Sequence, residues 1–197
     1  MSLKKQTLSG VFWTFTDTFV LRGLSFIASV ILARLLGPTE FGLIGMISIF
    51  IAIGNSLVDS GLSASIIRTK DANNEDFSTV FYLNLLMSFL VYALLFVTAP
   101  LIADFFNQEI LVLIVRVYCI NFIISAFSSI QMAILNRGMK FKKIMQCKIP
   151  GTILGVIVGV GMGYMGFGVW SMVWMFLTTQ IVSSLMLWLN STWKPGL

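Results

Sequence analysis

Six mainly apolar stretches follow one another along the chain, separated by short polar or glycine-containing segments. A helix crosses a bilayer with about 20 residues at a rise of about 1.5 Å each, and the stretches come close to or exceed that length. The pattern therefore predicts an all-α integral membrane protein, a single six-transmembrane-helix bundle within residues 1–197. The expected spans are 11–35, 42–67, 78–102, 110–136, 149–164 and 168–190.

The first stretch places an arginine, Arg22, near the middle of an apolar helix. At 3.6 residues per turn, one narrow face of this helix carries Thr14, Thr18, Arg22, Ser25 and Ser29. Its Val, Ile, Leu and Phe residues favour insertion by about 4 to 8 kcal/mol, whereas Asp17 and Arg22 oppose insertion by up to about 5 to 7 kcal/mol. Because these free energies nearly cancel, we expect the polar face to meet a hydrated cavity or partner helices.

Polar residues also form one-sided stripes on other stretches. The second stretch carries Ser48, Asn55, Asp59 and Ser63, spaced by seven, four and four residues. The fourth has Arg116 one or two turns from its start, followed by Asn121, Ser125, Ser128 and Gln131. A charged residue inside a membrane span is costly and marks a candidate functional position.

Small and aromatic residues indicate how the last two stretches pack. Glycines recur at a strict four-residue spacing from Gly151 to Gly163, which is typical of a ridge that admits a neighbouring helix closely. The segment 163–168, GYMGFG, is the expected turn. The sixth stretch has tryptophans near both ends, as in the aromatic belts of membrane interfaces: Trp170, Trp174, Trp188 and Trp193.

Composition removes several classes of function. Of the 197 residues 57% are hydrophobic and 11% are charged, against about 25% charged in soluble domains. The chain has no histidine, the commonest general base and metal ligand. Its two cysteines, Cys119 and Cys147, lie in different settings and suggest neither a disulfide framework nor a zinc site. We therefore expect no enzyme activity, no cofactor and no metal.

Positive charges predict the orientation in the membrane. The net charge of +5 arises from residues between the apolar spans, so it does not indicate a nucleic-acid partner. The segment 137–148, RGMKFKKIMQCK, holds five basic residues and no acidic ones, and we expect it to be a cytoplasmic loop. With both termini cytoplasmic, ten of the 13 lysines and arginines lie inside, as the positive-inside rule requires.

Four strings along the chain carry a family resemblance: ILARLLGPTEFG at 31–42, DSGLSASII at 59–67, AILNRGMKFKKI at 133–144 and GFGVWSMV at 166–173. Together they resemble the amino-terminal half of the Wzx-type polysaccharide flippases of the multidrug/oligosaccharidyl-lipid/polysaccharide exporter superfamily. The resemblance implies two six-helix bundles facing each other across a central cavity in the bacterial inner membrane. It also implies transport of lipid-linked oligosaccharides for polysaccharide or O-antigen biosynthesis.

The implied cargo has a polyprenyl tail that stays in lipid and a pyrophosphate-sugar head that needs a hydrated, cationic path. Arg22 is the first candidate to bind its phosphates, because a guanidinium stays charged and binds phosphate oxygens bidentately. Arg116 is the second candidate, and Asn55, Thr18 and Ser25 are candidates for the sugar hydroxyls. Asp17 and Asp59 are expected to balance the arginines or to accept a coupling proton or sodium ion.

Other interpretations stay open at this stage. In one, Arg22 and Asp59 form a structural ion pair between two helices. In another, the Arg116 side chain extends along its helix and places its charge at the membrane interface. A drug or small-ion exporter of the same superfamily shares the architecture. The chain ends about where the second bundle of the family begins, so it is either a non-catalytic truncated fragment or a half that associates with a second copy; we favour the fragment. Membrane lipids are the remaining expected partners.

Overall fold

The computed structural model describes residues 3–58, 74–191 and 193, and the side chains of residues 19–58, 75–191 and 193. Within these ranges the chain is helical and contains no strand. The helices are α1 (Leu3–Leu36), α2 (Pro38–Val58), α4 (Asn74–Phe106), α5 (Ile110–Tyr118), α6 (Ile120–Arg137), α7 (Phe141–Tyr164) and α8 (Trp170–Leu189).

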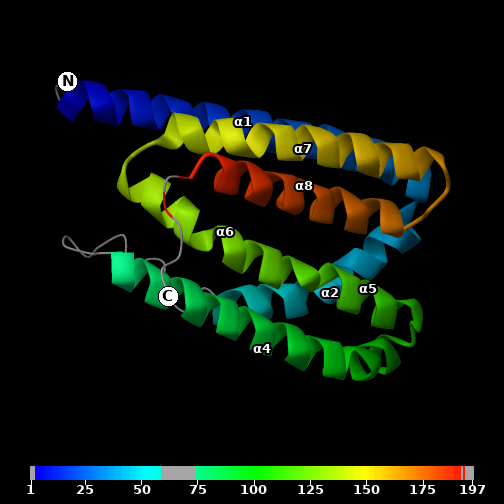
Figure 1. Cartoon of the computed structure of the whole chain (residues 1–197). Helices are drawn as coiled ribbons and strands as arrows, with labels where there is room; N and C mark the ends of the chain where they lie inside the picture. Colours follow the sequence, from blue (N-terminus) through cyan, green and yellow to red (C-terminus); the bar gives the residue numbers. More distant parts are fainter. Residues whose placement is uncertain (1–2, 59–73, 192, 194–197) are drawn as a thin grey trace.

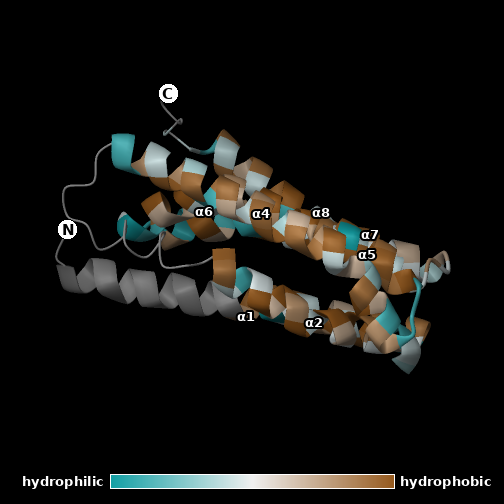
Figure 2. Ribbon diagram, turned by 90° about the horizontal axis from the view of Figure 1, so that it is seen from below, coloured by the Kyte–Doolittle hydropathy of each residue, from teal (hydrophilic) through white to brown (hydrophobic). Residues whose placement is uncertain are grey.

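Six of the described helical segments are long and apolar enough to cross a membrane, with α5 and α6 together forming one of them. Figure 2 shows hydrophobic residues along most of the coloured length of these helices, with more hydrophilic ones near several helix ends. The all-α membrane fold that the hydrophobic pattern predicts is therefore confirmed.

Several helix boundaries differ from the expected spans. Helix α1 begins at Leu3, α4 begins at Asn74, and α7 begins at Phe141 rather than at residue 149. Residues 141–148 are thus the first two turns of α7 and not part of a loop. Lysine is a good helix former, and Lys143 stabilises this end by donating a hydrogen bond of 2.6 Å to the backbone oxygen of Asn190, just after α8.

The fourth expected span is divided at Cys119 into α5 and α6, although the backbone stays nearly helical there. The amide of Cys119 still donates to the carbonyl of Val115 at 2.9 Å. Helix α2 is described as far as Val58, so the expected end of the second span, near residue 67, lies outside the described residues.

The helices form two layers that meet at α6 (Figure 1). Helix α1 runs along α7, α7 packs on α8, and α6 lies between α8 and α4, with α2 beside α4 and α6. The largest apolar core lies among α2, α4, α5, α6 and α8, and includes Ile47, Leu111, Ile114, Phe122 and Val173. The start of α1, the end of α8 and the connection from α6 to α7 lie at one end of the bundle.

The closest contact between two helices is made by the glycines that recur at every fourth residue of α7, from Gly151 to Gly163. A Cβ added to Gly155 would collide with Thr179 Oγ1 and would lie 2.6 Å from the carbonyl oxygen of Met175. At Gly159 a Cβ would lie 2.5 Å from the Cβ of Met175. Because a side chain has no room at these positions, the backbones of α7 and α8 touch directly, as the spacing predicts.

Three of the left-handed residues in the described turns that join the spans are glycines, and the other two are Asn107 and Met139. Gly37, between α1 and α2, has φ = 78°, and the α7–α8 turn contains Gly166 at φ = 81° and Gly168 at φ = 56°. Side chains rarely adopt these angles, so glycine is favoured at all three positions. The expected GYMGFG turn is confirmed.

The two ends of the bundle provide a test of the predicted orientation. Met139, in the α6–α7 connection, is 56% exposed, and Phe167, in the α7–α8 turn at the other end, is 52% exposed. We expect Met139→Cys, in a background with Cys119 and Cys147 replaced, to react with a membrane-impermeant maleimide only after the membrane is permeabilised. Phe167→Cys should react in intact spheroplasts. The reverse labelling pattern would show that the basic end faces outward.

Candidate functional site

A polar cavity of about 430 Å³ lies among α1, α6, α7 and α8. Ten of its 14 lining residues have polar side chains, which is unusual for the inside of a membrane bundle. They are Ser125, Ser128, Ser129 and Asn136 of α6, Lys148 and Thr152 of α7, and Thr179, Gln180, Ser183 and Ser184 of α8. The apolar part of the lining includes Leu21 of α1.

Helical periodicity explains why these residues meet. On α6 the polar positions 125, 128, 129 and 136 lie on one face, and on α8 the positions 179, 180, 183 and 184 do the same. On α7, Lys148 and Thr152 are one turn apart. Because the glycine ridge holds α7 against α8, the polar faces of these two helices border the same space.

Several hydroxyl groups of the lining donate to their own helix. Ser128 donates to the carbonyl of Ser125 at 3.1 Å, Thr152 to that of Lys148 at 3.3 Å, and Thr179 to that of Met175 at 2.8 Å. The hydroxyl of Ser129 donates to the carbonyl of Ala126 and accepts a bond of 3.2 Å from the amide nitrogen of Asn84 in α4. These bonds satisfy the donors and leave oxygen lone pairs available to the cavity.

Lys148 is the one charged residue among the described lining residues, and it is half-buried. It lies seven residues after the start of α7, about 10 Å along the helix axis. None of the described lining residues is a carboxylate. The cavity is therefore a neutral polar space with a single cationic centre, and a cation at such depth needs water, a ligand or an anionic partner.

The predicted site residues whose side chains the structure describes do not line this cavity. Arg22 and Ser25 of α1 and Asn55 of α2 are exposed on the surface of the bundle. Leu21 faces the cavity, and the next residue on a helix is turned by about 100°, so Arg22 is directed elsewhere. The side chains of Asp17, Thr18 and Asp59 lie outside the described part of the structure.

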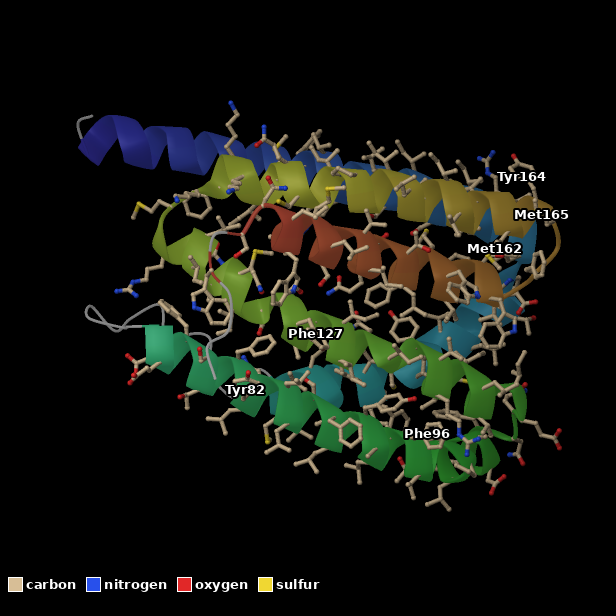
Figure 3. All side chains as sticks on the ribbon, in the orientation of Figure 1. Tyr82, Phe96, Phe127, Met162, Tyr164 and Met165 are labelled. Atoms are coloured by element: carbon tan, nitrogen blue, oxygen red, sulfur yellow. The ribbon has the colours of Figure 1, made fainter. Side chains whose placement is uncertain are left out.

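Arg116 of α5, the second predicted cation, lies over the ring of Phe96 in α4. Figure 3 labels Phe96. The guanidinium carbon of Arg116 is 4.3 Å from the centre of the Phe96 ring, which is a cation–π contact. Its Nε atom is buried and has no hydrogen-bond partner in the described part of the chain. Neither Arg116 nor Arg22 lines the polar cavity.

Sequence reasoning missed the residues that form the cavity on α7 and α8. The sequence pattern places Lys148 in a basic loop, and the span that contains the polar positions 179, 180, 183 and 184 has no charge to mark it as a candidate site. Their spacing of one, three and one residues was the available signal, since it places all four on one helix face.

An apolar groove of about 470 Å³ runs between α2 and α4. It is lined by residues such as Phe50, Ile53, Leu94, Leu101 and Phe105. Thr98 is its one polar side chain, and that hydroxyl donates to the carbonyl of Leu94 at 2.9 Å. The groove therefore presents an almost purely hydrocarbon surface, in contrast to the polar cavity.

A multi-pass helical bundle with a polar cavity inside it is typical of membrane transporters. Comparison with known proteins adds the family: residues 31–197 match the polysaccharide biosynthesis protein family, and the chain belongs to it. No solved structure matches the chain significantly.

Relatives in bacteria are named as biosynthesis or transport proteins for polysaccharides. The chain is 26% identical over 155 residues to the lipopolysaccharide biosynthesis protein WzxC of Escherichia coli, covering 79% of this chain and 32% of that one. It is 27% identical over 171 residues to the teichuronic acid biosynthesis protein TuaB of Bacillus subtilis, covering 87% and 34%. It is 25% identical over 180 residues to the succinoglycan biosynthesis transport protein ExoT of Rhizobium meliloti, covering 91% and 36%. The chain thus spans about a third of the length of these relatives.

Proposed function

We propose that this chain forms the amino-terminal six-helix bundle of a transporter that flips lipid-linked oligosaccharides across the bacterial inner membrane. The cargo is a polyprenyl-pyrophosphate repeat unit for polysaccharide or O-antigen synthesis, and it moves by alternating access. The observation that carries the proposal is the polar face that the bundle leaves exposed at membrane depth, with Arg22 and Ser25 on α1 and Asn55 on α2.

An exposed guanidinium in a span facing lipid costs several kcal/mol, so this face is expected to meet water or protein. The bundle itself does not cover it, because Arg22, Ser25 and Asn55 remain exposed in the presence of the other described helices. A second six-helix bundle facing α1 and α2 would enclose these residues in a hydrated central chamber. The relatives, about three times as long, have room for such a bundle.

Within this chamber the proposed roles follow from the chemistry of each group. Arg22 binds the pyrophosphate oxygens, and Asn55, Ser25 and Thr18 donate to or accept from the sugar hydroxyls. Asp17 and Asp59 balance the charge or take up a coupling proton or sodium ion. Arg116, held on Phe96 away from α1, keeps a possible phosphate role only if the cargo reaches the α4–α5 side.

The apolar groove between α2 and α4 supports the lipid part of the proposal. It lies on α2, the helix that carries Asn55, so a head group at the polar face and a tail in hydrocarbon would lie against neighbouring surfaces. With the positive-inside arrangement, the head group enters from the cytoplasmic leaflet and both termini of the bundle lie in the cytoplasm.

Arg22→Ala in the gene that encodes this chain is expected to lower surface polysaccharide about tenfold or more, because a charge-assisted contact to phosphate is lost. Arg22→Lys should keep part of the export, since it keeps the charge but not the bidentate geometry. Surface polysaccharide and the membrane abundance of each variant are measured together. Normal export in both variants would remove Arg22 from the cargo path, and reduced abundance would assign it a structural role.

A further inference from the structure

We propose that the polar cavity among α1, α6, α7 and α8 is an anion-binding pocket for a phosphate-class group, with Lys148 as its cationic centre. This pocket is separate from the exposed face of Arg22 and Asn55. The identity of the natural anion, a phosphorylated lipid head group, rests on the proposed function. The residues that would bind the anion all belong to this chain.

The first argument is the state of the polar groups in the cavity. Within the described part of the chain, the side chains of Lys148, Asn136, Gln180, Ser125 and Ser184 make no hydrogen bond to protein. Their donors comprise an ammonium, two amides and two hydroxyls. Polar groups at membrane depth need partners, so five side chains without protein partners around one space indicate water or a ligand there.

The second argument is the sign and location of the charge. The described lining offers one positive and no negative side chain, so the local field favours an anion. Lys148 lies about 10 Å into α7 from the end that carries the basic segment. Phosphorylated head groups of lipids lie at this depth of a membrane, and basic pockets between transmembrane helices bind them.

The third argument is size. A space of about 430 Å³ lies within the range of small-molecule pockets, which begins near 300 Å³. At about 30 Å³ for each water it holds on the order of a dozen waters. It therefore suits a phosphate or pyrophosphate group better than a complete oligosaccharide repeat unit.

The test uses the purified protein in nanodiscs of neutral phosphatidylcholine and follows its thermal unfolding. Farnesyl pyrophosphate is expected to raise the unfolding midpoint in a saturable manner, and farnesol, which lacks the anion, is not. Inorganic pyrophosphate separates the two sources of the anion. Stabilisation by both farnesyl pyrophosphate and inorganic pyrophosphate would show that the free anion suffices. Stabilisation by farnesyl pyrophosphate alone would show that the pocket needs a lipid head group.

Lys148→Gln is expected to weaken the apparent affinity about tenfold or more, because a charge-assisted contact is removed. Lys140→Gln is the matched control, since it makes the same change at an exposed position just before α7, and it should bind as the unmodified protein does. Lys148→Arg should retain most of the affinity. Equal binding by Lys148→Gln and the unmodified protein, an equal loss in the Lys140→Gln control, or no stabilisation by either anion would overturn the proposal.

Two further variants cover the case in which Lys148→Gln does not fold. Ser125→Leu keeps the charge but fills part of the cavity, so it should also abolish anion binding; unchanged binding would overturn the proposal. Asp17 precedes Leu21 by four residues, and if Asp17→Asn restores the abundance of Lys148→Gln, then Lys148 serves as an ion-pair partner and the proposal fails. If Arg22→Ala lowers export but the protein binds no anion, the pocket proposal fails and the proposed transport function stands. If the protein binds the anion but Arg22→Ala exports normally, the pocket proposal stands and the proposed role of Arg22 in transport fails.

Discussion

Gly155→Leu is expected to destabilise the protein by about 3 kcal/mol or more, the largest effect of any substitution considered for this chain. A Cβ at position 155 already meets Thr179 Oγ1 and lies 2.6 Å from the backbone oxygen of Met175, and backbone cannot move aside without separating α7 from α8. The loss of the contact should appear as a lower unfolding midpoint in detergent and as less protein in the membrane.

Gly161→Leu is the matched control for this prediction. It makes the same replacement in the same helix, but no atom lies within 4 Å of a Cβ at position 161. We expect its unfolding midpoint and abundance to remain near those of the unmodified protein. If Gly155→Leu unfolds no earlier than Gly161→Leu, then the close α7–α8 contact does not hold the bundle together.

Gly54→Ala is expected to destabilise the protein by about 1 to 3 kcal/mol through a collision with one aromatic ring. A Cβ at position 54 would lie 2.5 Å from Cζ and 3.0 Å from Cε1 of Phe122. Phe122 is 1% exposed and belongs to the apolar core, so its ring has little space into which to move. Thermal unfolding of the purified variant measures the effect.

The size-complementary variant Phe122→Leu shortens the opposing side chain and tests the cause. In the double variant with Gly54→Ala, we expect a favourable coupling of about 1 kcal/mol relative to the sum of the single changes. Gly45→Ala, also in α2 but with no atom within 4 Å of its Cβ, should not be destabilising. Additive effects in the double variant would contradict a direct contact between positions 54 and 122.

The sequence predicts those parts of the fold that depend on a single local property, such as the length of an apolar stretch or the spacing of glycines. The length of the apolar stretches predicted six spans, and the spacing of Gly151, Gly155, Gly159 and Gly163 predicted a close helix contact, since a helix brings every fourth residue to one side. Left-handed glycines in 163–168 formed the expected turn. These features depend on the geometry of residues that are close together in the sequence, so the sequence alone is enough to predict them.

The site was harder to predict because a helical face does not indicate which neighbour covers it. Arg22 lies on the polar face of α1 that the sequence predicts, but Arg22 does not line the cavity, which Leu21 borders instead. Lys148 was placed in a loop because basic residues usually mark loops in membrane proteins. The helix in fact begins at Phe141, since α7 extends beyond the apolar stretch.

Direct backbone contact along α7 and α8 also bears on how such a bundle changes shape. The α7 glycines have no side-chain rotamers to exchange at this contact, and a shift of α7 toward α8 would meet the backbone oxygens of Met175 and Thr179. We therefore expect this hairpin to move as one rigid unit. Gly37, the left-handed residue between α1 and α2, is the expected position of bending between those two helices.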